Sequence, residues 1–200
     1  MANTVCERSG CEAALPAAGR GPVPRFCSTR CRVAAHRARR AADTAVPKEL
    51  TARRRWVRRD ERKAPRTLDG GFASVTVPAT WTSYRDAQAA TVGVGVGFVL
   101  AEGDGLVCVD LDHCLVDGEL APWARDILDR CPPTFTEVSP SGDGLHIWGR
   151  GHVERGRRIR RGGEAVEIYG QGRYVAVTGR RFEGCPAKLT DISEVIASLI

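Results

Sequence analysis

The chain has 200 residues, of which 42% are hydrophobic and 27% are charged, a composition typical of a globular protein and not of a disordered or fibrous one. No apolar run approaches the ~20 residues of a membrane span, and the first ten residues lack the apolar core of a secretion signal. We therefore expect a cytoplasmic protein with one well-packed domain and a small additional module.

The charge is divided unevenly along the chain. Residues 1–66 carry 17 Lys and Arg against 6 Asp and Glu, whereas residues 67–200 carry 13 against 18. A basic arm on an acidic domain indicates a polyanionic partner for the arm and metal-binding acids in the domain. A tail that only improves solubility is the alternative, and charge alone does not exclude it.

Four of the eight cysteines form two close pairs at the start of the chain: Cys6 and Cys11, then Cys27 and Cys31. In a small cytoplasmic chain such cysteines favour metal binding or free thiols over disulfides. Two pairs bridged by a Pro- and Gly-rich loop can place four thiolates around one tetrahedral Zn²⁺, and the metal would supply the stability that the loop lacks. The sequence therefore predicts a zinc-binding module over residues 1–45.

A basic helix is expected to follow the second cysteine pair, with Ser28 as its cap. The stretch from Phe26 to Arg37 resembles small bacterial zinc-finger modules that end in such a helix. His36 could replace a cysteine as a ligand, but we expect it to face solvent or nucleic acid.

The remaining chain predicts an α+β domain over residues 53–200, joined to the arm by a linker at 46–52. The Gly-rich turn at 103–105 is expected to pair the strands before and after it as a hairpin. Ser83 is expected to cap a helix, with Asp86 three positions later. Short connections indicate a largely antiparallel sheet. Strands are predicted at 53–59, 93–100, 106–112, 134–139, 145–148, 165–169 and 173–178, and further helices at 120–130 and 191–200.

The strand at 106–112 ends in two carboxylates, Asp110 and Asp112. Side chains on a strand alternate between its faces, so both acids should emerge on the same face. Two carboxylates this close repel each other unless a proton or a cation lies between them. A hard divalent cation such as Mg²⁺ or Mn²⁺ suits these oxygen ligands, although a lone pair of acids could also be simply solvated.

Two later stretches carry further polar residues. The loop at 139–144 offers backbone N–H groups and the hydroxyl of Ser141 to an anion, and His146 follows where it could donate to a phosphate oxygen. Glu167 lies between apolar neighbours in a strand, and Arg173 follows it as a cation for phosphates. The alternatives are a structural histidine and, for Glu167, a salt bridge to an arginine in the range 157–161.

These residues together resemble the three motifs of the archaeo-eukaryotic primase superfamily, and most closely the bifunctional primase-polymerase domains of phages and plasmids. Asp110 and Asp112 match the first motif, Ser141, Gly142 and His146 the second, and Glu167 the third. Lys63 and Pro65, and the stretch from Pro78 to Trp81, resemble family features upstream of the first motif. The resemblance covers roughly residues 50–190.

The resemblance implies an RRM-like, largely antiparallel catalytic sheet with a second small α/β unit. It implies template-directed nucleotidyl transfer from NTPs or dNTPs on a DNA template and primer, with Asp110, Asp112 and Glu167 binding Mg²⁺ or Mn²⁺. It further implies that the nucleotide phosphates are held by Ser141, Gly142, His146, Arg173 and Lys63.

Two other functions remain open from the sequence. The same three acids could bind the metal ions of a metal-dependent nuclease. Alternatively, the domain could be catalytically inactive, and the protein would then be a zinc-finger DNA-binding protein. The preference between ribo- and deoxynucleotides, and a separate replicative helicase as partner, also stay open.

Overall fold

The computed structural model describes residues 5–8, 10–16, 24–43 and 46–200. The chain divides into two compact units, Met1–Thr44 and Ala45–Ile200. In the part of the chain that is described, no helix has both the length and the apolar content required to cross a membrane.

The first unit is small and is organised around its cysteines and one helix. An isolated bridge joins Val5 to Ala14, and helix α1 runs from Thr29 to Asp43. The side chain of Ser28 accepts a hydrogen bond from the backbone N–H of Cys31 at 3.2 Å, which confirms the predicted cap. The apolar side chains that this unit buries are Cys6 and Cys31 among the described residues, so little hydrophobic core supports it.

The second unit contains mixed α and β structure. Its helices are α2 (Lys48–Thr51), α3 (Tyr84–Ala89), α4 (Pro122–Arg130) and α5 (Ser193–Leu199), with a 3-10 turn at Pro78–Thr80. Its strands are β1 (Trp56–Arg59), β2 (Pro65–Arg66), β3 (Gly95–Leu100), β4 (Leu106–Asp112), β5 (Leu115–Val116), β6 (Glu119–Leu120), β7 (Thr136–Val138), β8 (Leu145–Arg150), β9 (Arg157–Arg161), β10 (Glu164–Tyr169) and β11 (Arg173–Val177).

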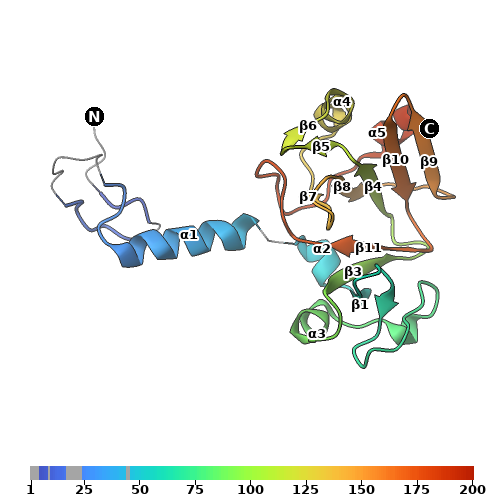
Figure 1. Cartoon of the computed structure of the whole chain (residues 1–200), viewed down its shortest axis with the longest axis horizontal. Coiled ribbons are helices and arrows are strands. Elements are labelled where there is room, and N and C mark those ends of the chain that lie inside the picture. The colour runs from blue at the N-terminus through green and yellow to red at the C-terminus, as the bar shows by residue number, and fades with distance from the viewer. Residues whose placement is uncertain (1–4, 9, 17–23, 44–45) are drawn as a thin grey trace. The chain divides into compact units, whose positions relative to one another are not determined.

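Two antiparallel sheets form the body of the second unit (Figure 1). The larger has the order β7-β8-β4-β10-β9, and the smaller has the order β11-β3-β1-β2, while β5 and β6 form a separate hairpin. The prediction of a mixed α/β domain with antiparallel pairing is therefore confirmed.

Alternation along β4, β8 and β10 gives the five-stranded sheet two different faces. Val109, Ile147 and Ile168 point to one face, where they pack with Ile127 of α4 and Ile196 of α5. The other face packs against the four-stranded sheet through a second core. This core contains Cys108, Trp148, Tyr169, Phe98, Trp56 and Val175. Since Asp110 and His146 lie two residues from Cys108 and Trp148, they share the face that looks toward the four-stranded sheet.

The predicted hairpin between residues 93–100 and 106–112 is wrong. β3 belongs to the four-stranded sheet and β4 to the five-stranded sheet, so the turn at 103–105 carries the chain from one sheet to the other. Asp104 in this turn accepts hydrogen bonds from Arg53 at 2.8 Å and Arg55 at 3.1 Å. These bonds stabilise a crossing for which turn composition alone gives no signal.

Part of the segment expected to be a linker is structured. α2 occupies residues 48–51, and its Leu50 is fully buried in the core between the two sheets. Ser83 caps α3 as predicted, since its hydroxyl oxygen accepts a hydrogen bond from the N–H of Asp86 at 3.1 Å.

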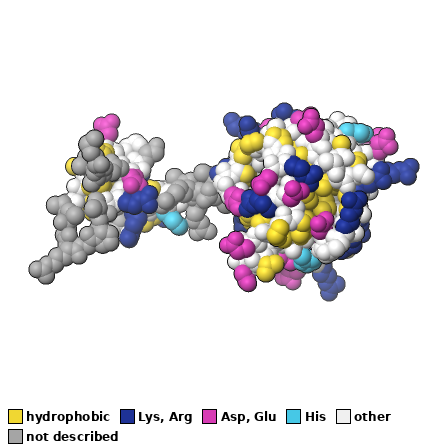
Figure 2. Space-filling model, turned by 90° about the horizontal axis from the view of Figure 1, so that it is seen from above, with side chains coloured by type: hydrophobic (Ala, Val, Ile, Leu, Met, Phe, Trp, Pro, Cys, Tyr) yellow, Lys and Arg dark blue, Asp and Glu magenta, His cyan; other side chains and the backbone are white. Residues whose placement is uncertain are grey.

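Figure 2 shows that Lys, Arg, Asp and Glu side chains are interspersed with apolar ones over the face of the second unit that it presents. Residues 45–200 carry 22 Lys and Arg against 21 Asp and Glu, so this unit as a whole is close to neutral, and local arrangements of charge decide what each region can bind.

Candidate functional site

Five charged side chains form one row across the five-stranded sheet, one from each strand. Asp110 on β4 pairs directly with His146 on β8 and with Glu167 on β10. His146 pairs with Glu137 on β7, and Glu167 pairs with Arg158 on the edge strand β9. Directly paired residues of antiparallel strands point to the same face, so the row is a continuous line of side chains.

The three predicted carboxylates meet at the centre of this row. One oxygen each from Asp110, Asp112 and Glu167 lie within 4.8 Å of one another. Oδ1 of Asp110 is buried and accepts no hydrogen bond within the structure. An orphaned carboxylate oxygen beside two further carboxylates is an arrangement that a hard divalent cation would satisfy, so these residues fit the metal site that the sequence predicts.

Burial raises the pKa of Asp110 to about 6, against the attraction of His146 and with the help of repulsion from Asp112 and Glu167. This carboxyl therefore keeps its proton to a higher pH than an ordinary aspartate, and a cation bound between the three acids would favour its ionised form.

A cavity of about 510 Å³ opens over the carboxylates, between the two sheets. β11 supplies one wall through Arg173, Tyr174 and Val175, and Lys63 and Pro65 lie at another side. The cavity thus combines acids on one sheet with cations from other elements, which suits a ligand that carries both phosphates and metal ions.

His146 is held by Glu137, a residue that the sequence analysis missed. Oε1 of Glu137 lies 3.3 Å from Nδ1 of His146 and accepts the indole N–H of Trp148 at 3.1 Å. Its Oε2 accepts the backbone N–H groups of Thr178 and Gly179, at 2.9 and 2.7 Å, and the Thr178 hydroxyl at 3.1 Å. Five donors therefore surround one fully buried carboxylate.

The environment of His146 favours its protonated form. Burial lowers the pKa of this imidazole, but the hydrogen bond to Glu137 and the charges of Asp110, Glu137 and Asp112 outweigh burial, and the pKa is raised. Nε2 of His146 lies 3.7 Å from Oδ1 of Asp110, at the floor of the cavity.

Glu167 has protein partners as well as carboxylate neighbours. Nε of Arg158 lies 3.1 Å from its Oε1, and the hydroxyl of Tyr169 donates to its Oε2. Arg173 lies 4.0 Å from Oε2 and stacks on the Tyr169 ring with its guanidinium carbon 4.7 Å from the ring centre. The salt bridge that was the alternative to a metal role is present, and it coexists with the approach to Asp110 and Asp112.

The loop at 139–144 is closer to a structural turn than expected. Its N–H groups at Ser139 and Gly142 donate to carbonyl oxygens within the loop, and the Ser141 hydroxyl contacts Ser139 and Asp143. Pro140 lines the cavity, whereas neither Ser141 nor Gly142 belongs to its lining. A Cβ at Gly144 would lie 2.7 Å from the Leu111 carbonyl oxygen, so glycine is required where this loop crosses the end of β4.

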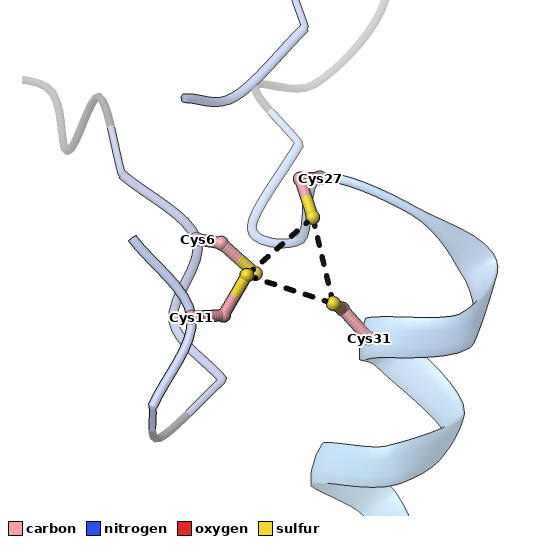
Figure 3. Close-up of side chains that lie close together, drawn as sticks. All are labelled: Cys6, Cys11, Cys27 and Cys31. Carbon is pink, nitrogen blue, oxygen red and sulfur yellow. Dashed lines mark hydrogen bonds between the residues drawn. The ribbon is translucent and has the colours of Figure 1, made fainter. Parts of the chain in front are cut away.

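The second predicted metal site is in the first unit. The sulfur atoms of Cys6, Cys11, Cys27 and Cys31 lie within 4.8 Å of one another (Figure 3). The sulfur of Cys27 lies 3.8 Å from that of Cys11 and 3.4 Å from that of Cys31. The sulfur atoms of Cys11 and Cys31 are 3.8 Å apart. Tetrahedral Zn²⁺ with Zn–S bonds of about 2.3 Å requires sulfur atoms about 3.8 Å apart, so the four thiols fit this ion. His36 is exposed on α1 and lies outside the cluster.

Glu137 could have been found from the sequence. It is an acid between Thr136 and Val138 in a predicted strand, which is a weaker form of the pattern that singled out Glu167, since one of its neighbours is polar. Arg158 and Tyr169 gave no comparable signal, since arginines and tyrosines at strand positions are common, and only the register of β9 and β10 brings them to the carboxylates.

Comparisons with known proteins show the family to which the chain belongs. A sequence model of the family described as bifunctional DNA primase/polymerase, N-terminal, matches residues 15–199. The chain is 36% identical over 154 residues to a DNA primase-polymerase of Nitratiruptor phage NrS-1. That alignment covers 72% of this chain and 21% of the phage protein, so the chain spans about a fifth of the length of this relative. The chain that places three carboxylates and a histidine on one sheet face thus belongs to the bifunctional DNA primase/polymerase family.

Proposed function

We propose that this chain performs template-directed nucleotidyl transfer on DNA, as a primase or polymerase, at the cavity between its two sheets. The observation that carries the proposal is the convergence of Asp110, Asp112 and Glu167 at the floor of that cavity, beside His146. Family membership supports the class of reaction, and the geometry supports the roles that we propose for these residues.

We assign two divalent metal ions, Mg²⁺ or Mn²⁺, to the three carboxylates. When bound, such a pair neutralises charge as a 3′-hydroxyl attacks the nucleotide and pyrophosphate leaves. The protein's contribution is to fix the ligands in place: Asp110 and Glu167 are opposite each other on adjacent strands, and Tyr169 and Arg158 orient the Glu167 carboxylate.

We assign the phosphates of the incoming nucleotide to His146, Arg173 and Lys63. Protonated His146 donates Nδ1–H to Glu137, which leaves Nε2–H free to donate toward the cavity, where a phosphate oxygen would accept it. Arg173 and Lys63 line the same cavity and add positive charge. For Ser141 and Gly142 the proposed role is weaker, because they lie outside its lining.

We propose that the first unit binds one Zn²⁺ through its four cysteines and that the basic arm contacts DNA. The sulfur geometry supports the ion, and the 8 Lys and Arg against 3 Asp and Glu in residues 1–45 support a polyanionic partner. Under this proposal residues 1–45 act as a DNA-contacting module and the catalytic domain begins in the region of residues 46–53.

Primer extension tests the proposed function. Wild-type protein with a primed DNA template, nucleotides and Mg²⁺ or Mn²⁺ should lengthen the primer, and Asp110→Asn should abolish extension because a metal ligand loses its charge. Asp117→Asn removes an exposed acid outside the cavity and should extend normally. Shortening of the primer by wild-type protein would instead identify a nuclease. Binding of DNA without lengthening or shortening of the primer would identify a DNA-binding protein whose catalytic domain is inactive.

A further inference from the structure

β9 is an edge strand in which four of five residues are arginine: Arg157, Arg158, Arg160 and Arg161. All four are exposed. Alternation divides them between the two faces of the sheet, and their pairing with β10 shows which arginine faces which side.

Arg158 and Arg160 face the carboxylates. Arg158 pairs with Glu167, which pairs in turn with Asp110. Arg160 pairs with Ala165, which pairs with Asp112. Arg158 is therefore one strand beyond Glu167, and Arg160 is two strands beyond Asp112, on the same face of the sheet, and Arg158 lines the cavity.

Arg157 and Arg161 face the opposite side. Arg157 pairs with Ile168, whose side chain belongs to the core beneath α4 and α5, and Ile159 between them packs against the same core. One strand thus presents two matched pairs of arginines, and only one pair faces the site.

The position of β9 relative to His146 indicates what Arg158 and Arg160 could bind. In an in-line displacement at phosphorus, the attacking hydroxyl and the leaving pyrophosphate lie on opposite sides of the transferred group. His146 on β8 lies on one side of Asp110, and β10 and β9 lie on the other. If the leaving pyrophosphate lies on the His146 side, the 3′ end of the primer approaches from the side of β9. Arg173, which lies 4.0 Å from Glu167, would then contact the transferred phosphate between these two sides.

We propose that Arg158 and Arg160 bind backbone phosphates of the primer strand near its 3′ end. Their positive charge, their exposure and the position of Arg158 in the cavity lining match a polyanion that must reach the metal-site acids. This assignment rests on the proposed function, which it extends from the nucleotide to the strand that receives it.

Arginines on an edge strand also have a simpler use, because charge there prevents the strand from pairing with other chains. For that purpose a charge at any position along the strand is sufficient, so all four arginines would be equivalent. Binding of primer phosphates distinguishes Arg158 and Arg160 from Arg157 and Arg161, which makes the second pair a control of identical chemistry.

The experiment compares two double variants of the full chain, Arg158→Gln with Arg160→Gln and Arg157→Gln with Arg161→Gln, which carry the same net charge. Fluorescence anisotropy with a labelled primer-template measures Kd over a range of KCl concentrations. The first variant should raise Kd on the order of tenfold and reduce the slope of log Kd against log salt by about 1 to 2, relative to the second. Because Arg158 also contacts Glu167, single Arg160→Gln is included and should raise Kd roughly threefold.

Two results would overturn the assignment. Equal loss of affinity in both double variants would mean that the arginines of β9 attract DNA equally from both faces of the sheet. An unchanged Kd with a raised KM for the nucleotide in the Arg158/Arg160 variant would place the triphosphate there. Failure of the wild-type protein to extend primers would count against the proposed function alone, since the difference in Kd between the two variants is measured without catalysis.

Discussion

Glu137 is a side chain whose importance depends on its neighbours more than on its own chemistry. A buried carboxylate is costly unless it is fully hydrogen-bonded, and this one has donors from β8 and from Thr178 and Gly179 after β11. It therefore links β7, in the five-stranded sheet, to the chain that leaves β11 of the four-stranded sheet. It also fixes the imidazole of His146.

Glu137→Gln should be strongly destabilising although it preserves the shape of the side chain. An amide offers one acceptor oxygen and brings an NH2 group into a site where five donors already converge, so the loss should be about 2 to 4 kcal/mol in the free energy of unfolding, measured in urea. The NMR titration of His146 should also move to lower pH, since the hydrogen bond that raises its pKa is weakened. Glu119→Gln, at an exposed position, is the control and should change neither. A stable variant with an unshifted histidine would contradict this role.

Asp110 should make the metal-free protein less stable as the pH rises. Its pKa is about 6 in the folded chain against 3.8 for the free side chain, so the folded state holds a proton that the unfolded state has lost between these values. Stability attributable to this group is therefore present at pH 4 and falls as the pH rises through about 6.

Asp110→Asn should consequently raise the melting temperature in EDTA at pH 7, by the equivalent of about 2 kcal/mol, with the difference shrinking toward pH 4. Differential scanning calorimetry at both pH values measures it, with Asp117→Asn as the control. If the variant melts below wild type at pH 7, burial of the Asp110 charge, together with repulsion from Asp112 and Glu167, is not the dominant cost at this site.

At the level of elements, alternation predicted which side chains share one face of a strand, but it did not predict which strands are neighbours in a sheet. The face shared by Asp110 and Asp112 follows from a period of two within β4. The approach of Glu167 to Asp110 depends on the register of β10, and two strands separated by more than fifty residues leave no local signal of register. The wrong hairpin between β3 and β4 has the same origin, because a Gly-rich turn indicates a change of direction and not the sheet in which each strand continues.

The short elements escaped prediction for a different reason. β9 is almost entirely arginine, a residue type with no strong strand preference, and it forms because β10 offers it an unpaired edge. α2 has one turn, too few residues for a periodic pattern, and its formation follows from the burial of Leu50.

Helix α1 and the cysteine cluster should depend on each other. Cys31 lies in the first turn of α1, and Cys27 immediately precedes the Ser28 cap, so a metal ion held by both would anchor the start of the helix. Cys27→Ser with Cys31→Ser should remove about one equivalent of zinc per chain by elemental analysis and reduce helical circular dichroism. Cys114→Ser, at a buried cysteine of the second unit, controls for general loss of thiols. An unchanged zinc content would exclude the site.

At the scale of the whole molecule, the two units differ in how they are stabilised and in charge. The second has three hydrophobic clusters, whereas the first has a cysteine cluster and a basic helix. Residues 1–44 carry 8 Lys and Arg against 3 Asp and Glu, whereas residues 45–200 carry 22 against 21, so most of the excess positive charge belongs to the first unit.

Removing residues 1–45 should flatten the salt dependence of DNA binding. Each lost phosphate contact lowers the slope of log Kd against log salt by about 0.7 to 0.9, so loss of several contacts from a basic arm is readily measured by anisotropy. Circular dichroism of the shortened chain establishes that residues 46–200 keep their fold. A slope equal to that of the full chain would mean that the arm makes no contribution to DNA binding.

The row from Glu137 to Arg158 also determines where the chain can change in length. Each of its five members comes from a different strand, and adding one residue inside any of these strands moves every later side chain of that strand to the other face. Inserted residues are compatible with the site only where the chain is outside this sheet, as at the exposed turn between β5 and β6, where Asp117 and Gly118 have positive φ angles of 51° and 85°. Among natural variants of this domain, gains and losses of residues should therefore collect at such turns, and the five strands should keep a constant length.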